Sequence, residues 1–448
     1  MTAPVFVESG LRAAVHDAWP LLTSVLLMMT GSGLLGSLLG VRAEREQFGS
    51  GAIGLVLALF YVGYVAGSAW APGLIRSVGH IRVFAALTSL ASATVLIHGV
   101  WLFPLGWMGL RFLTGACIAG LFVTTESWLQ QVSTTRTRAT ILSVYNSVVT
   151  GGLAVGSLLL NVADVGGLTP FVLGSVIVSV AAVPIALAPR ESPVLPEHAP
   201  ISLARMFRSV PLGVMGASLS GICTGTALGF GAVYASRAGF DVAQISQLLA
   251  ATLVGGTLGQ VPLGRWSDRT DRRVVMLVAA ALISVGAGAG IVATAGDAFA
   301  GAAVAAAVVG AGAFSLYGMS FAHVGDYLEP GAMAAAGAHL LRVNGLSAAS
   351  GPLVSSLAVT LLGAEGFFVW LAAAPIPFFA LTAVRLVRRR AVDEHERASY
   401  TAVPSTATMA VVEETMAEVI GVEPEEIRRR ARRFRVGNRL LGRHTARR

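Results

Sequence analysis

The sequence predicts an all-α integral membrane protein whose 12 transmembrane helices form two pseudo-symmetric six-helix bundles. Three observations support this fold class. Apolar residues make up 54% of the 448 residues and charged residues only 12%, about half the charged share of a soluble domain. Twelve apolar stretches are long enough to cross a bilayer. The second half of the chain also repeats residues of the first half at a constant offset.

Each predicted helix is a continuous apolar stretch of about 20 residues, the length that crosses a hydrocarbon core about 30 Å thick. The apolar runs do not alternate with polar residues, which favours helices over a β-barrel. In chain order the predicted spans are 19–40, 51–71, 82–102, 106–129, 138–161, 167–188, 210–234, 243–263, 274–295, 298–322, 334–361 and 366–386.

An internal repeat predicts how these spans are grouped. A shift of 192 residues superposes identical residues in nine pairs, among them Gly33 with Gly225 and Arg45 with Arg237. We therefore expect an N-terminal six-helix half at 1–188, a cytoplasmic linker at 189–209, a C-terminal six-helix half at 210–388 and a basic cytoplasmic tail at 389–448. Two halves related in this way are typical of transporters, whose substrate sites lie near the midplane between them.

The composition excludes several classes of enzyme. All 32 basic residues are arginine, so the chain has no lysine for a Walker A phosphate loop or for a Schiff base with pyridoxal phosphate. Nothing has metal-ligand spacing, and no Gly-x-Ser-x-Gly nucleophile elbow occurs. We expect no enzyme activity, no cofactor and no metal site.

Arginine placement predicts a multi-pass protein of the cytoplasmic (inner) membrane with both termini in the cytoplasm. Outside the tail, 12 arginines then lie in cytoplasmic segments and only Arg42, Arg45 and Arg237 in outer loops, as the positive-inside rule requires. This rule also accounts for the net charge of +8, and no nucleic-acid partner is expected. The tail segment 424–448 predicts either a helix on anionic inner-leaflet lipid or a disordered basic extension. A monomer is expected.

The segment between the eighth and ninth spans predicts a conformational latch. It reads Gly264-Arg-Trp-Ser-Asp268-Arg269-Thr-Asp-Arg272-Arg273. The glycine lets two helices approach closely, and the aspartate at the helix end can form charge-assisted pairs that stabilise one conformation. The corresponding loop of the first half keeps Gly79 and Arg82 but has Arg76 in place of the aspartate.

Several segments of the sequence also resemble the motifs of a known protein family. The segment 264–273 resembles motif A of the major facilitator superfamily, and Arg111 followed by Gly115 resembles its motif B. Gly152 and Gly156 resemble half of motif C of the antiporter branch. The run Glu126-Ser-Trp-Leu, together with Arg42, resembles the YcaD-like subgroup. The resemblance covers about residues 19–386 and implies the major facilitator fold, transport by alternating access and, from motif C, export by antiport.

Two arginines within spans are candidate pathway residues. An arginine in hydrocarbon costs about 2.5–3.5 kcal/mol, so Arg111 and Arg342 are expected to face a cavity and to have partners. Each either holds an anionic or hydrogen-bonding substrate or forms a buried link between helices. Further polar candidates for the pathway are Asn344, Tyr145, Asn146, Tyr317 and Gln247.

Glu126 and Asp326, near the inner ends of the fourth and tenth spans, and His339 are candidates for proton coupling or for a latch. As latch partners we expect Arg136 and Arg138 for Glu126, and Asp268 and Arg269 for Asp326.

We therefore expect a secondary active transporter that moves a small molecule by alternating access, as a proton-coupled exporter of a drug-like or amphiphilic metabolite. Its expected partners are this substrate, protons and the lipid bilayer. One alternative is uptake or facilitated diffusion of a small organic anion. An alternative of another class is a membrane sensor or scaffold that signals through the basic tail.

Overall fold

The structure, a computed structural model, describes residues 11–132, 138–187, 203–327 and 333–388. Within these ranges all regular structure is helical. The first six spans contain α1 (Leu11–Arg45), α2 (Ser50–Val78), α3 (His80–Val100), α4 (Pro104–Val132), α5 (Arg138–Leu158), η1 (Leu159–Asn161), α6 (Thr169–Val180) and α7 (Ala182–Ala186). The last six contain α9 (Pro211–Thr224), η2 (Gly225–Phe230), α10 (Gly231–Arg237), α11 (Val242–Arg269), α12 (Arg272–Ala295), α13 (Phe299–Gly325), α14 (Met333–Leu362), α15 (Gly366–Ala373) and α16 (Ile376–Arg388).

Twelve stretches within the described residues are long and apolar enough to cross a membrane, and this confirms the predicted fold class. Several helices extend beyond the predicted spans; α11, for example, continues to Arg269. A short helix, α8 (Leu203–Ser209), occupies the end of the predicted linker. The division of the chain at residues 189 and 210 stays a prediction, and the predicted tail lies outside the described residues.

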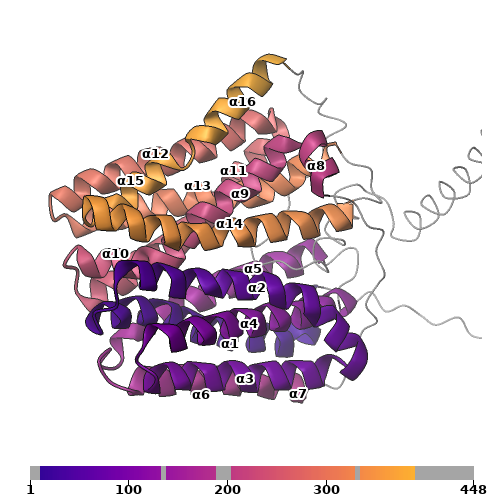
Figure 1. The fold of residues 1–448 in the computed structure, drawn as a ribbon. Coiled ribbons are helices and arrows are strands. Elements are labelled where there is room, and N and C mark those ends of the chain that lie inside the picture. The colour runs from indigo at the N-terminus through magenta and orange to yellow at the C-terminus, as the bar shows by residue number, and fades with distance from the viewer. Residues whose placement is uncertain (1–10, 133–137, 188–202, 328–332, 389–448) are drawn as a thin grey trace, which may run out of the picture.

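The two sets of six helices pack side by side, α1 to α7 below and α9 to α16 above in Figure 1. They meet where α2 contacts α14 and where α5 contacts α11. A shift of 192 residues moves Ser50, the first residue of α2, to Val242, the first residue of α11, and it moves α5 onto α14. The shift therefore exchanges the two contact pairs, as a pseudo-twofold axis between the halves requires.

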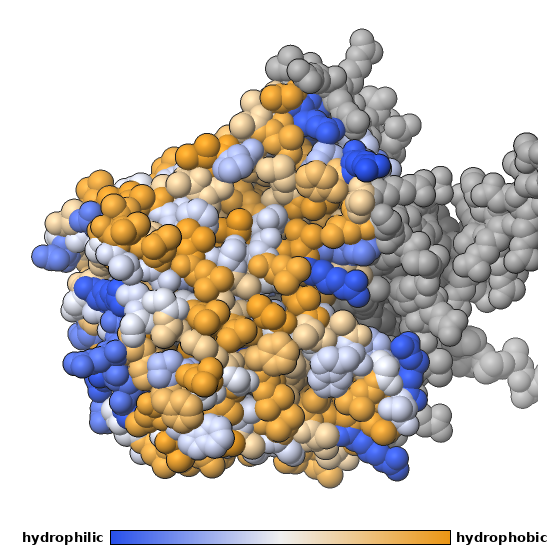
Figure 2. Space-filling view, viewed as in Figure 1, coloured by the Kyte–Doolittle hydropathy of each residue, from blue (hydrophilic) through white to orange (hydrophobic). Residues whose placement is uncertain are grey.

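The outer surface has the character of a membrane protein. Large apolar side chains on several helices are mostly exposed, including Leu258 (69%), Val292 (73%) and Leu361 (71%). Figure 2 shows apolar residues covering the side of the bundle, with hydrophilic residues gathered near its two ends. A lipid bilayer solvates such a belt, whereas water would not.

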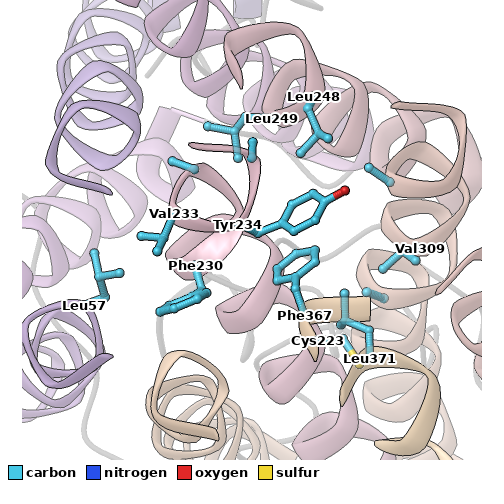
Figure 3. Close-up of a cluster of buried hydrophobic side chains, with 14 of the residues drawn as sticks. Leu57, Cys223, Phe230, Val233, Tyr234, Leu248, Leu249, Val309, Phe367 and Leu371 are labelled. Atoms are coloured by element: carbon cyan, nitrogen blue, oxygen red, sulfur yellow. The ribbon is translucent and has the colours of Figure 1, made fainter. Parts of the chain in front are cut away.

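An even number of spans places the entry of α1 and the exit of α16 at one end of the bundle, called here the terminal end. At the opposite end an apolar core cluster joins the two halves. Figure 3 shows part of this cluster, with Leu57 of α2 beside Phe230 and Val233 of the second half. Tyr234 stacks on Phe367 beside them, with ring centroids 4.5 Å apart. This packing seals the space between the halves at the opposite end.

Candidate functional site

A cavity of about 160 Å³ lies between the two halves. Residues of α1, α2, α4 and α5 line it from the first half, and residues of α9, η2, α11 and α14 line it from the second. Its position matches the expected place of a substrate site between repeated halves.

Helical periodicity explains which residues reach the cavity. On α4 they are Arg111, Thr114, Ile118 and Phe122; on α2 they are Leu57, Phe60, Tyr61 and Tyr64; on α14 they are Leu341, Asn344, Gly345 and Ala348. Steps of three or four residues keep side chains on one face of a helix. Each of these helices therefore presents one continuous stripe to the cavity.

Close packing of α2 on α4 sets the position of the aromatic residues. A Cβ on Gly63 would meet the backbone of Phe112, and a Cβ on Gly115 would meet the backbone of Phe60. Glycine at both positions lets the two helices approach at backbone distance, as small residues do in membrane bundles. This approach brings the Arg111 guanidinium over the Phe60 ring, 4.4 Å from its centroid, a cation–π geometry.

Arg111 is the one charged residue among those that line the cavity. Its side chain is 6% exposed. Among the described residues it has no ion-pair partner, and its Nε has no hydrogen-bond acceptor. A buried guanidinium without an acceptor is costly, so this group is available to an anionic or acceptor group of a bound solute.

Glu126 lies on α4 beyond Phe122, fully buried. The Tyr145 hydroxyl donates a hydrogen bond to its Oε1 at 2.8 Å. Electrostatic interactions also link Glu126 to Tyr64 of the cavity wall and to Tyr317 of the second half. Arg111 and Glu126 are separated by about 22 Å along the helix at 1.5 Å per residue, so they are two distinct sites on one helix.

Three other predicted pathway residues occupy different places. Asn344 lines the cavity, and its Nδ2 donates to the Ala217 carbonyl at 3.0 Å. Asn146 of α5 donates to Gln260 of α11 at 3.0 Å, a hydrogen bond between the halves. Tyr317 is buried, and its hydroxyl has no hydrogen-bond partner among the described residues.

Arg342 and Gln247 do not line the cavity, and both side chains are exposed. The expectation that Arg342 is buried is wrong. Its neighbour Leu341 and the later Asn344 face the cavity, and a step of one residue rotates a side chain by about 100° around the helix. Depth in a span was predictable from the sequence, but the direction of the side chain around the axis was not. His339, on the same helix, is half-buried.

The predicted latch segment forms an ion-pair cluster at the terminal end. Gly264 and Asp268 lie on the last turns of α11, so both are helical rather than part of a loop. Gly264 is buried and Asp268 is half-exposed. Asp268 Oδ1 lies 3.6 Å from Arg272 Nη2, and Asp326 Oδ2 lies 3.1 Å from Arg272 Nε. Arg272 is 2% exposed. This cluster joins the ends of α11, α12 and α13.

The partners of Asp326 and Arg273 are both close in the structure. Asp326 pairs with Arg272, whereas the expected partner Arg269 is exposed. Arg273 pairs with Asp271, at 2.7 Å, within the same turn.

In the first half, Gly79 connects α2 and α3 with a φ of 88°, a conformation that favours glycine. Arg82 is exposed. The side chains of Arg136 and Arg138, the expected partners of Glu126, lie outside the described residues.

Polar contacts between the halves at the opposite end were not predicted. Arg237 of α10 pairs with Glu44 of α1 at 2.8 Å and donates to Ser50 at 2.9 Å. Asn161 donates to Ser246 at 2.8 Å. The repeat superposes Arg45 on Arg237 and so indicates a basic residue at this position, but no local pattern indicates its partner.

The first half carries its own contacts beside this pair. Arg42 donates to the carbonyls of Val165 and Gly166. Arg45 pairs with Asp164 at 3.3 Å. The Gly166 backbone N–H, followed by Arg45, holds the pKa of the Asp164 carboxyl below its usual value. These contacts tie the end of α1 to the loop after η1, within one half.

Solved structures share this architecture. A mutant form of the nucleoside transporter NupG superposes with a TM-score of 0.72 at 14% identity, covering 83% of this chain and all of that one. A bacterial homologue of the human lysosomal transporter Spinster, inward-facing and unoccupied, superposes with a TM-score of 0.60 at 15% identity, covering 92% of this chain and 99% of that one. At these identities the likeness concerns the fold.

Sequence comparisons show the family. The Major Facilitator Superfamily model matches residues 21–338 and 214–420. An uncharacterized MFS-type transporter of Yersinia pestis (strain Pestoides F) is 26% identical over 389 residues, 86% of this chain and 97% of the relative. The uncharacterized MFS-type transporter YcaD of Salmonella newport (strain SL254) is 26% identical over 313 residues, 69% of this chain and 80% of the relative. The chain is therefore a multi-pass inner-membrane protein that belongs to the major facilitator superfamily of secondary transporters and resembles its YcaD-like group.

Proposed function

We propose that this transporter exports a small amphiphilic solute in exchange for protons, by alternating access. The observation that carries the proposal is the cavity between the halves, with apolar and aromatic residues along most of its wall and the buried carboxylate of Glu126 beyond Phe122 on α4. In this proposal the terminal end faces the cytoplasm, because the arginine-rich segments lie there.

Alternating access needs a seal at each end of the cavity, and the two seals must open in turn. The apolar cluster and the pair between Arg237 and Glu44 supply the seal at the opposite end. The cluster of Asp268, Arg272 and Asp326 supports the terminal end of the second half. Rocking of the halves would break the first set of contacts while leaving the second, which is internal to one half, intact.

Glu126 is the proposed proton carrier. A carboxyl group in this role needs burial together with a route to water. Tyr64 lines the cavity and interacts electrostatically with Glu126, and in this proposal the route runs past its side chain. Tyr317 belongs to the other half, so movement of the halves changes the surroundings of the carboxyl group. Since proton binding then differs between the two conformations, the proton gradient can drive the conformational change.

Export is favoured by Gly152 and Gly156, which carry the resemblance to the antiporter motif. A Cβ on Gly156 would meet the backbone of Thr30, and one on Gly152 would meet Met29. These glycines therefore let α5 pack closely on α1 beside the cavity. A second candidate is uptake or facilitated diffusion of a small organic anion, and the lone cation Arg111 in the cavity wall favours it.

The test is transport by the purified full chain in liposomes under an imposed pH gradient, with a panel of amphiphilic dyes and organic anions. Antiport predicts solute movement against the proton flow. The variant Glu126→Gln should lose gradient-driven flux but keep solute exchange without a gradient. Glu365→Gln, the same substitution on a half-exposed residue before α15, should match the parent.

Solute movement along the proton flow, or flux that ignores the gradient, would support the uptake candidate instead. If the chain transports no probe in either direction, the hypothesis of a membrane sensor or scaffold would be the one that remains. Unchanged proton-driven flux in Glu126→Gln would remove Glu126 from the mechanism.

A further inference from the structure

The cavity wall carries a single positive charge, which favours a solute with a negative charge. Arg111 is the one charged residue that lines the cavity, and among the described residues it has neither an ion-pair partner nor an acceptor for its Nε. It lies seven residues into α4, about 10 Å from the start of the helix at the opposite end. A solute that fills the cavity therefore meets a single unneutralised positive charge near the sealed end.

The aromatic residues of the wall are also uneven, because all four come from the first half. Phe60 and Tyr61 have ring centroids 5.4 Å apart, and Phe60 and Tyr64 are 6.4 Å apart. Tyr64 and Phe122 follow at 6.3 Å. Each centroid distance lies within the range of favourable aromatic pairs. The four rings form one continuous aromatic wall that begins at the Arg111 guanidinium, which lies over Phe60.

The facing wall from the second half is mainly aliphatic. Leu249, Leu253 and Leu341 line it, together with the small residues Gly229 and Gly345. This wall also contains the polar side chains of Thr224 and Asn344, and it offers apolar contact area but no charge. An apolar body in the cavity therefore contacts this surface on one side and the aromatic wall of the first half on the other.

We propose that the cavity binds a monoanion with a planar aromatic body, an aromatic carboxylate in the simplest case. The carboxylate accepts charge-assisted hydrogen bonds from the Arg111 guanidinium, and the ring packs on the aromatic wall. A second negative charge would find no cation in the lining, and a positive group would be repelled by Arg111. This assignment rests on the proposed function, because it concerns the solute of the same cavity.

Binding to the purified full chain in detergent tests the assignment, with ligand-dependent thermal stability as the readout. The probes are 2-naphthoate, its neutral amide 2-naphthamide, the dianion naphthalene-2,6-dicarboxylate and cyclohexanecarboxylate. We expect 2-naphthoate to bind about 10- to 100-fold more tightly than the amide, the range that a charge-assisted hydrogen bond gives. The dianion and the non-aromatic acid should both bind more weakly than 2-naphthoate.

The variant Arg111→Gln should bind acid and amide equally, and Arg111→Lys should keep part of the preference for the acid. Arg208→Gln, which changes an exposed arginine of α8, is the matched control and should bind as the parent does. If Arg111→Gln fails to fold, the comparison of acid, amide and dianion on the parent chain still decides the question. Equal affinity for acid and amide in the parent would overturn the proposal.

The outcome separates this inference from the proposed function. Proton-driven flux of neutral or cationic dyes, with no binding of 2-naphthoate and no competition by it, would overturn the monoanion assignment and leave proton-coupled export standing. Binding of 2-naphthoate that Arg111→Gln abolishes, without any proton-driven flux, would support the site and overturn the proposed coupling.

Discussion

Breaking the ion pair between Glu44 and Arg237 should open the seal at the opposite end. The pair crosses from the first half to the second, with Arg237 Nη2 2.8 Å from Glu44 Oε1, and the side chain of Arg237 is 23% exposed and that of Glu44 20%. Exposed pairs contribute at most about 1 kcal/mol, and removing one partner of a buried pair costs about 3–5 kcal/mol. We therefore expect Glu44→Gln to destabilise the sealed conformation by about 1–2 kcal/mol.

This free energy corresponds to about a 5- to 30-fold increase in the population of the open conformation while that population is small. Val233→Cys supplies a reporter, because Val233 is fully buried in the seal. Its rate of labelling by a membrane-impermeant maleimide should rise by the same factor in Glu44→Gln. The native Cys117 and Cys223 are both buried. The chain without Val233→Cys gives their labelling rate, which serves as the background.

Asp164→Asn is the matched control, because it breaks the more exposed pair with Arg45, which lies within one half. It should change the labelling rate less than twofold. Added salt should raise the rate in the parent and not in Glu44→Gln, because salt screens the pair that the variant lacks. Equal rates in the two variants would refute the assignment of the Arg237 pair to the seal.

Two further pairs of variants test the buried polar groups. Asp326→Asn should lower the free energy of unfolding by about 3–5 kcal/mol, because it leaves Arg272 buried without its close carboxylate. Asp268→Asn should lower it by less than about 1 kcal/mol. Denaturant unfolding followed by tryptophan fluorescence measures both variants, and equal losses of stability would contradict this ranking. Tyr317→Phe should leave stability unchanged or raise it by about 1–3 kcal/mol, because it removes a buried hydroxyl that has no hydrogen-bond partner in the part of the chain that the structure describes. Tyr145→Phe should lower stability by about 1.5–3 kcal/mol, because that hydroxyl bonds a carboxylate; thermal unfolding of the two variants in parallel decides whether they differ in sign.

The twelve spans and the repeat were predictable because both are local properties of the chain. A span needs only enough consecutive apolar residues, and a repeat needs only identical residues at one offset. Arg111 was predictable as a cavity residue for the same reason, since the cost of a cation in hydrocarbon depends on depth. Arg342 met the same criterion but lies exposed, because its direction around α14 depends on the packing of neighbouring helices.

Pairings across the fold were not predictable. Glu44 and Arg237 are 193 residues apart, and Arg272 and Asp326 are 54 apart. Each residue stands at a helix end where many charged side chains would be tolerated, so the sequence indicates a charge there but not its partner. The aromatic wall was missed in part for a related reason. Phe60 and Phe122 resemble any other apolar residue of a span, and only the packing of α2 on α4 brings them together with Tyr61 and Tyr64 in the cavity wall.

The two halves carry different functional groups, although a shift of 192 residues relates helices of one half to helices of the other. Arg111, Glu126 and every aromatic ring of the cavity wall belong to the first half, while the second half contributes a mainly aliphatic surface and one buried tyrosine, Tyr317, that interacts electrostatically with Glu126. Substitutions among the leucines of that surface would therefore reshape the cavity for a different solute without changing Arg111 or Glu126. Diversification of such a carrier is easiest on the side that holds no charge.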